Sequence, residues 1–248
     1  MFPIRDHNPS GRTPYVTYAL IALNVIAFLS YVNLFGDPRA LNIFFWEWGI
    51  LPARIEQGDG YETLLTSMFL HAGFLHIAGN MLFLWIFGDN LEDAMGHLGF
   101  LLFYLAAGIG AGLVHVMLSP GSLVPTVGAS GAIAGVMGGY LLLFPKAKID
   151  ILLIIIIFFR IFTIPAWIML AVWFALQFFG GLSADANMGG VAYWAHAGGF
   201  LVGIVFALPV LLRRGGKSYW QENEFHPPHP EAKYDPSRIP TIHRRRRR

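Results

Sequence analysis

Four polar side chains stand out within long apolar stretches of the sequence: His76, Asn80, Ser130 and His196. A serine hydroxyl is a poor nucleophile until a base removes its proton, and a histidine is the usual base. Ser130 and His196 fit those two roles. The oxyanion that forms at an attacked carbonyl needs positioned donors, which His76, Asn80 and the Ser130 amide at a helix start can supply. The chemistry indicated is nucleophilic acyl transfer. It would use a Ser–His dyad, because these apolar stretches contain no Asp or Glu that could orient His196.

The elements that carry these residues are expected to pack closely. Asn80 follows His76 by four residues, so both lie on one helix face, with His71 five residues before His76. Helices with small residues at every fourth position can approach one another closely. Two stripes of this kind occur, one after Ser130 (Gly131, Gly135 and Gly139) and one around His196 (Ala195, Gly199, Gly203 and Ala207). Packing the two stripes together predicts that Ser130 lies near His196.

Other interpretations of these residues stay open. The glycines are also typical of plain helix packing, and a serine at a helix start often only caps it. A zinc protease would need an HExxH motif, which the sequence lacks. Ligation of a metal by His71, His76 and His196 is an alternative, but we expect no metal and no cofactor.

The composition indicates a lipid bilayer as the main surroundings. Of 248 residues, 55% are hydrophobic and 13% charged, and the mean hydropathy is +0.54. Soluble domains carry roughly 25% charged residues. This composition excludes a disordered chain and a nucleic-acid binder, so we expect no nucleic-acid partner. There is no Cys, and five of the 17 basic residues form the terminal run 244–248.

Five charge-free stretches are long enough to cross a bilayer: 13–36, 63–88, 94–145, 161–184 and 186–212. The third is twice the needed length and breaks at Ser119, Pro120 and Gly121 and again near Pro125, so we divide it into helices near 97–118 and 129–144, which makes six. The sequence therefore predicts an all-α, polytopic membrane protein with six transmembrane helices. We expect a cytoplasmic segment at 1–12, a membrane domain at 13–214 and a disordered cytoplasmic tail at 215–248. The apolar run 149–162 is interpreted as an interfacial connector.

Basic residues predict the orientation, because cytoplasmic loops are enriched in Lys and Arg. They flank the first, fourth and sixth spans on one side, whereas acidic residues dominate the loop 37–62. Both termini are therefore expected in the cytoplasm. We expect no removable signal peptide and, in the absence of an organelle presequence, the inner membrane of a bacterium. His97 and His115 are expected near the membrane edges.

These residues resemble the rhomboid family of intramembrane serine proteases, of bacterial type. Three patterns carry the resemblance: HxxxxHxxxN (His71, His76, Asn80), GxSG (Gly128 to Gly131) and AHxxGxxxG (Ala195, His196, Gly199, Gly203). It implies a six-helix core with Ser130 as nucleophile, His196 as base, and an oxyanion hole from His76, Asn80 and the Ser130 amide. It also implies that Gly128 keeps the approach to that hole open, that His71 is structural or retains water, and that Glu92 and Gly96 are structural.

The sequence departs from the family pattern at two places. Many rhomboids carry a Trp-Arg pair in the first extracytoplasmic loop, where this chain has Glu62 and Thr63. Some also have an aromatic residue four positions after the serine that packs on the catalytic histidine, where this chain has Ala134. Tyr193, Trp194 or Phe200 are the alternatives for that packing.

The function expected from the resemblance is a serine endopeptidase that cleaves single-pass transmembrane proteins. Its partners would be those substrates and the bilayer; the sequence does not indicate an oligomeric state. Two alternatives from other classes are a transporter with His71, His76 and His196 as a proton relay, and an inactive chaperone that binds membrane helices. Transporters usually show an internal repeat, which we do not find here. Intact Ser130 and His196 argue against the inactive chaperone.

Overall fold

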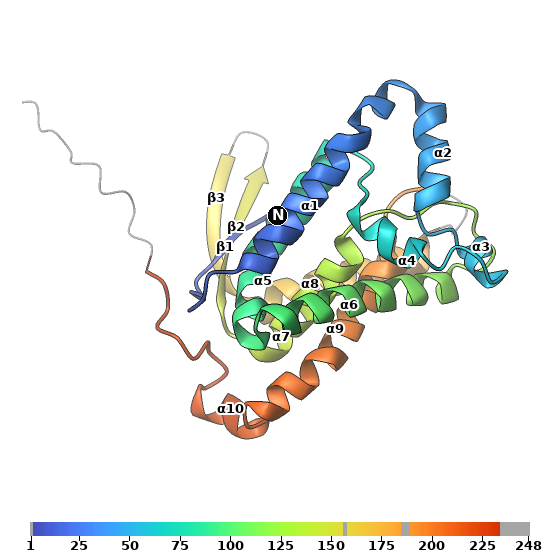
Figure 1. Cartoon of the computed structure of the whole chain (residues 1–248). Coiled ribbons are helices and arrows are strands. Elements are labelled where there is room, and N and C mark those ends of the chain that lie inside the picture. The colour runs from blue at the N-terminus through green and yellow to red at the C-terminus, as the bar shows by residue number, and fades with distance from the viewer. Residues whose placement is uncertain (1, 156–157, 185–188, 234–248) are drawn as a thin grey trace, which may run out of the picture.

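The structure is a computed structural model that describes residues 2–155, 158–184 and 189–233 (Figure 1). Most of it is helical. The longer helices are α1 (Tyr15–Tyr31), α2 (Pro38–Trp48), α5 (Phe74–Met95), α6 (His97–Leu118), α7 (Ser130–Leu143), α8 (Ala166–Ser183) and α9 (Tyr193–Arg213). The shorter ones are η1 (Val32–Gly36), α3 (Pro52–Glu56), α4 (Thr63–Thr66), η2 (Ser67–Phe69) and α10 (Lys217–Glu222). The strands are β1 (Phe2–Asp6), β2 (Lys148–Ile155) and β3 (Phe158–Pro165).

Four helical segments of the described chain are long and apolar enough to cross a membrane: Tyr15–Gly36, α6, α8 and α9. A fifth span is formed if Thr63–Phe69 and α5, which are bent by 96° at residues 70–73, count as one. The boundaries expected at 97–118 are confirmed by α6. The segment expected at 129–144 is α7, whose 14 residues rise only about 21 Å, less than the roughly 30 Å of a bilayer core.

A three-stranded antiparallel sheet corrects the expectation of an all-α fold. Its order is β1-β2-β3, with Lys148 paired to Pro165 and Asp6 paired to Ile149. The run expected to be an interfacial connector is thus mostly a hairpin. Isoleucine-rich segments favour strands because branched side chains pack well on a pleated surface. The run is apolar on both faces, so it shows no alternation that marks a strand.

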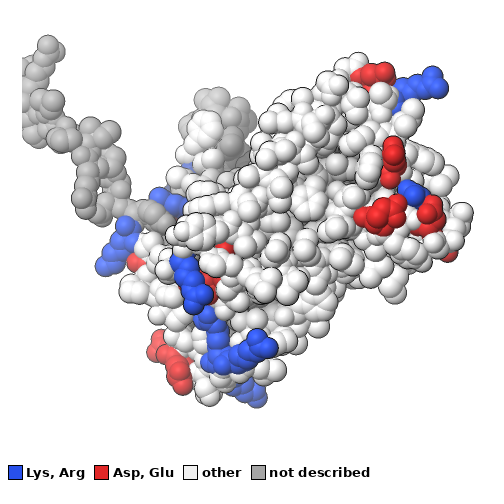
Figure 2. Space-filling view, in the orientation of Figure 1, with Lys and Arg blue, Asp and Glu red and all other residues white. Residues whose placement is uncertain are grey.

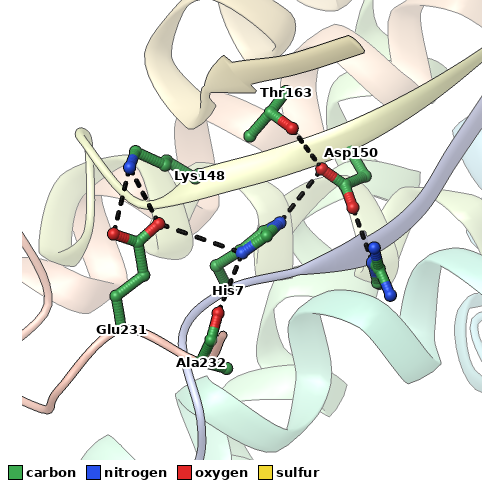
Figure 3. A network of polar contacts seen from close by, with 7 residues as sticks. His7, Lys148, Asp150, Thr163, Glu231 and Ala232 are labelled. Carbon is green, nitrogen blue, oxygen red and sulfur yellow. Dashed lines mark hydrogen bonds and ion pairs between the residues drawn. The ribbon is translucent and has the colours of Figure 1, made fainter. Parts of the chain in front are cut away.

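Polar contacts at the base of the hairpin join both ends of the chain to it (Figure 3). Asp150, which is 1% exposed, accepts hydrogen bonds from Arg5, His7 and Thr163. The other ring nitrogen of His7 lies 3.0 Å from the carbonyl oxygen of Ala232. Burial alone would raise the pKa of Asp150, but these hydrogen bonds hold it below its usual value. We call the end of the bundle that carries β1–β3 and α10 the sheet end.

The tail expected to be disordered is partly ordered. Residues 217–222 form α10, and the indole N–H of Trp220 donates to the Leu142 carbonyl across 3.0 Å. Tyr219 is buried, and the Trp220 ring stacks on Phe225. Aromatic side chains bury enough apolar area to hold a short segment in place. The rest of the expected tail, 234–248, lies outside the described residues.

Glu92 fixes the start of α1. Its carboxylate accepts from the Val16 and Thr17 amides, each at 2.8 Å, and from the Thr17 hydroxyl at 2.7 Å. The first amides of a helix have no partner within it, so a carboxylate stabilises them. His97 Nδ1 contacts the same carboxylate, at the start of α6. Glu92 therefore joins α1, α5 and α6, which agrees with a structural role.

At the opposite end, called the loop end, α2 to α4 precede the bend into α5 (Figure 1). Around Glu62 and Thr63, Arg54 makes the main polar contacts. It contacts Asp59 at 2.7 Å and Glu62 at 3.3 Å, while the Thr63 hydroxyl donates to the Gly60 carbonyl at 2.6 Å. The guanidinium of Arg54 therefore ties the turn at Asp59 to Glu62, at the start of α4.

Charged side chains gather at the two ends of the molecule. Figure 2 shows Lys and Arg concentrated at the sheet end and Asp and Glu prominent at the loop end, with an uncharged band between them. Side chains on the outside of the bundle are apolar, as with Ile26, Leu102 and Leu201, each more than half exposed. Exposed apolar surface of this extent suits lipid rather than water.

The closest helix contact is between α7 and α9. A Cβ built on Gly203 would overlap the backbone of Gly135, and one on Gly199 would overlap the carbonyl of Gly131. Gly131 and Gly135 also face Ala111 and Ala107 of α6. Most of α7 is buried, so this central helix is packed on several sides by others. The two stripes of small residues do pack together as expected.

Replacing Gly203 with Ala tests this contact. The added methyl group would meet backbone atoms, which cannot rotate away, so we expect the free energy of unfolding to fall by about 2 kcal/mol or more. Gly79→Ala is the matched control, because nothing lies within 4 Å of a Cβ there and Ala favours a helix by about 0.5–1 kcal/mol. Thermal unfolding in detergent micelles measures both. Equal stability of the two variants would contradict the packing described.

A second prediction concerns Asp6, which accepts a hydrogen bond from the Tyr140 hydroxyl at 2.7 Å. Burial raises the pKa of Asp6 to about 8, the Tyr140 hydrogen bond lowers it in part, and nearby Asp89 raises it. Between about pH 4 and 8 the folded chain thus holds a proton that the unfolded chain releases, so stability falls as pH rises. The Asp6→Asn variant should show a smaller fall in stability over this range and be more stable than the parent chain at pH 8.

Asp150→Asn provides the opposite control for that experiment. Because hydrogen bonds hold the Asp150 pKa down, its carboxylate stabilises the fold above the unfolded pKa and that contribution is lost on acidification. The Asn variant should therefore be less stable than the parent at pH 7. Denaturant unfolding in micelles at pH 5, 6.5 and 8 compares the three chains. An Asp6→Asn variant with the parent's pH dependence would refute the assignment.

Candidate active site

Ser130 begins α7, at the end of a loop that is tied down on both sides. The Thr126 and Ile50 amides and carbonyls bond to each other, at 2.8 and 2.9 Å, and the Gly128 amide donates to the Ser67 carbonyl at 2.9 Å. Gly128 has a φ of +137°, which L side chains rarely adopt. These constraints fix where the backbone turns into α7 and hence where the Ser130 hydroxyl points.

The structure brings Ser130 and His196 into hydrogen-bond contact. Ser130 Oγ lies 2.7 Å from His196 Nε2, and the two residues come from α7 and α9. The close approach of the two helices at Gly131 and Gly199, each adjacent or close to one of the pair in sequence, makes this contact geometrically possible. A serine hydroxyl that donates to an imidazole has the arrangement of a nucleophile and its base.

Two further residues on α8 hold the His196 ring, and the sequence reasoning missed both. His196 Nδ1 lies 2.8 Å from Gln177 Oε1. The Trp173 ring packs on the imidazole, with 5.9 Å between ring centroids and 34° between planes. Trp173, rather than Tyr193, Trp194 or Phe200, therefore supplies the aromatic packing left open above. Gln177 carries no charge, so its residue type does not mark it as a partner for His196. The four-residue spacing of Trp173 and Gln177, which places both on one helix face, is the sequence signal that could have indicated it.

His76 and Asn80 lie on α5 and line the same cavity as Ser130 and His196. His76 Nδ1 accepts the Ala72 amide at 3.2 Å, which leaves the proton of a neutral ring on Nε2. A Cβ on Gly128 would lie 2.9 Å from that Nε2 and 3.4 Å from Ser130 Oγ, so the glycine leaves a gap between them. The buried Nδ2 of Asn80 has no partner among the described protein groups. The Nε2–H of His76 can therefore donate to an oxygen placed in the gap, and Asn80 keeps an unused donor at the same cavity.

His71 lies apart from this pair of donors. Its backbone amide donates to the Tyr31 hydroxyl at 2.6 Å, and that hydroxyl donates to the His71 carbonyl at 3.1 Å. The buried ring packs edge-on against His76, with 5.1 Å between centroids. His71 thus supports the position of His76 and does not line the cavity described next.

A cavity of about 970 Å³ joins the polar residues. Its walls include His76, Asn80, Ser130 and His196, together with Trp173 and the loop residues 189–192. His115 lines it as well, is 8% exposed, and bonds through Nε2 to the Thr126 hydroxyl at 2.9 Å. This corrects the expected placement of His115 at the membrane edge. Its partners lie in the loop that folds over the end of α6, which sequence spacing could not show.

The arrangement does not suit a metal bound by His71, His76 and His196. Both nitrogens of His196 are occupied by Ser130 and Gln177. Within the described residues, no group of three His, Asp or Glu side chains is placed to hold a metal ion.

The half-buried Ser130 and His196 lie within a bundle of apolar helices that are long enough to span a membrane. The Rhomboid domain family model matches residues 58–213. The chain therefore belongs to the rhomboid family, and it is a multi-pass integral membrane protein.

Individual relatives come from several kinds of organism. Rhomboid protein 1, mitochondrial, of Saccharomyces cerevisiae is 30% identical over 201 residues, 77% of this chain and 52% of that protein. Rhomboid protease GluP of Bacillus subtilis is 37% identical over 128 residues, 52% of this chain and 24% of that protein. RHOMBOID-like protein 6, mitochondrial, of Arabidopsis thaliana is 34% identical over 175 residues, 68% of this chain and 49% of that protein. The chain thus spans about half or less of these relatives' length.

Proposed function

We propose that this chain is an intramembrane serine endopeptidase that uses a Ser130–His196 dyad. The observation that carries the proposal is the 2.7 Å contact between Ser130 Oγ and His196 Nε2, at a cavity with uncommitted donors on the opposite side. A relative at 37% identity, Rhomboid protease GluP, carries the name of a protease. No metal or cofactor is required by this chemistry.

The first half of the reaction forms an acyl-enzyme. His196 Nε2 takes the Ser130 proton as Oγ attacks a peptide carbonyl, and the carbonyl oxygen becomes an oxyanion. His76 Nε2–H, Asn80 Nδ2–H and the Ser130 amide at the start of α7 donate to that oxygen. When the tetrahedral intermediate collapses, His196 gives the proton to the leaving amine, and the C–N bond breaks.

The second half needs water in an apolar bundle. A water molecule attacks the ester carbonyl as His196 takes a proton from it. His196 then gives that proton to Ser130 Oγ as the ester C–O bond breaks. The cavity supplies a polar space for that water, because His115, Ser119 and Thr126 line it beside the dyad. Water is otherwise excluded from the interior of a membrane domain.

The proposed setting is a six-span core in which α7 is the short central helix. The Lys and Arg residues of the sheet end would face the cytoplasm, with both termini, and the dyad would lie below the opposite surface, in a bacterial inner membrane. The substrates would be single-pass transmembrane proteins. A helical carbonyl is already hydrogen-bonded, so attack requires local unwinding, and we place the cut near small or helix-breaking residues at the loop-end side.

Replacement of the dyad provides the main test. Ser130→Ala and His196→Ala should each reduce cleavage of a model transmembrane substrate in liposomes to background, and the double variant should be no worse, because the two groups act as a unit. Ser30→Ala and His226→Ala, whose side chains bond only locally, are matched controls that should cleave normally. Mass spectrometry maps the cut site.

A fluorophosphonate probe separates the alternatives in the same preparations. A serine protease is labelled at Ser130 only while His196 is present. A transporter or an inactive helix-binding rhomboid would not be labelled. Cleavage by purified Ser130→Ala would end the serine-protease proposal.

Asn80→Ala tests the oxyanion hole separately. The variant loses one donor but keeps the dyad, so we expect kcat to fall by about 10²-fold while the probe still labels Ser130. His115 is not a neutral control for this comparison, since it lines the cavity. If Asn80→Ala were as inactive as Ser130→Ala and equally unreactive, with the fold intact by thermal unfolding, Asn80 would have a larger role than oxyanion binding.

A further inference from the structure

A histidine base needs a defined tautomer. A neutral imidazole has one N–H donor and one nitrogen acceptor. To accept the Ser130 proton, Nε2 of His196 must be the acceptor, so the ring proton must lie on Nδ1. In an apolar interior an Nδ1–H without an acceptor is costly in free energy, and the ring would then tend to turn or change tautomer.

Gln177 provides the acceptor. Its Oε1 lies 2.8 Å from His196 Nδ1, on the opposite side of the ring from Ser130. Trp173, one turn earlier on α8, packs on the same ring, so one helix sets both the plane and the hydrogen bond of the imidazole. Gln177 is itself partly buried.

We propose that Gln177 is a positioning residue that completes the Ser130–His196 pair as a third member, its amide oxygen holding His196 in the Nδ1–H tautomer. This rests on the proposed function for its consequence in catalysis, but the tautomer can be observed without it. The amide must present its oxygen. If the NH2 group faced Nδ1 instead, the ring proton would move to Nε2 and point at Ser130, and His196 could not act as base.

A neutral acceptor suits this location better than the carboxylate of a Ser-His-Asp triad. An ionised carboxylate beside the ring would have to be kept buried within the membrane domain, at a substantial cost in free energy. An amide selects the same tautomer without that buried charge. Its dipole stabilises the imidazolium less than a carboxylate does, so the pair should depend more on oxyanion donors.

Gln177→Leu removes the hydrogen-bond acceptor and leaves a side chain of similar size. We expect kcat for a transmembrane substrate to fall by about 10²-fold with KM changed less than about threefold, because the residue touches the base and not the substrate. Leu176→Ala, at a neighbouring position that is 63% exposed, is the control and should keep kcat. A Gln177→Leu variant that keeps kcat within about threefold would overturn the proposal.

Gln177→Glu distinguishes positioning from packing. A carboxylate at this place still accepts from Nδ1–H, so kcat should recover to within about tenfold of the parent. The acidic limb of the kcat/KM profile should move to higher pH, since a carboxylate stabilises the protonated ring. A Glu variant as inactive as Leu, with an intact fold by thermal unfolding, would show that shape and not the acceptor matters at 177, against the proposal.

The tautomer itself is measured by ¹⁵N NMR of histidine-labelled protein in micelles, with His196→Ala used to assign the signal. The full chain should show His196 protonated at Nδ1, and Gln177→Leu should lose that signature. An Nε2–H signal in the parent protein would refute the proposal even if no variant folded. If the parent shows Nδ1–H but neither cleaves nor reacts with a fluorophosphonate, the proposed function fails while the role of Gln177 stands.

Discussion

The structure depends on the backbone contact between α7 and α9. At Gly135 and Gly203 there is no room for a side chain on either helix, so the separation of the two axes is set by the chain itself. That separation decides whether Ser130 and His196 can share a hydrogen bond at 2.7 Å. In lipid there is little hydrophobic drive for helices to associate, so close packing of small residues is what holds such a pair together. The glycine stripes are therefore part of the site as much as of the fold.

In the proposed site the two histidines at the cavity take opposite tautomers, and a neighbouring group selects each one. The Ala72 amide donates to Nδ1 of His76, which leaves the proton on Nε2, whereas Gln177 accepts at Nδ1 of His196, which leaves a lone pair on Nε2. One ring thus presents a donor and the other an acceptor to the same gap beside Ser130. With water largely excluded, these hydrogen bonds satisfy the ring nitrogens and select their tautomers in place of solvent. They need no buried charge to do so.

The sequence predicted those features that leave a local pattern. Small residues at four-residue spacing predicted the α7–α9 contact and, with it, that Ser130 lies near His196. It did not predict the hairpin, because a strand apolar on both faces has no alternation. Gln177 was missed since it carries no charge, and His115 was misplaced because its contact with Thr126 depends on a loop path. The hairpin and the His115 contact depend on pairing between segments that no local spacing encodes, whereas the four-residue spacing of Trp173 and Gln177 was a usable signal.

The sheet end explains how α7 can be short and still be fixed. The helix begins at the loop end with Ser130, and near its other end the Tyr140 hydroxyl donates to Asp6 of β1. Arg5 and His7, on either side of Asp6, bond to Asp150, and the chain around Ala232 bonds to His7. The N-terminal strand, the hairpin and the C-terminal segment therefore form one polar assembly that holds the far end of α7, where the bundle no longer has long helices to do so. Contacts therefore hold both ends of this 14-residue helix and so fix the position of Ser130. Only the end that carries Ser130 lies at the cavity.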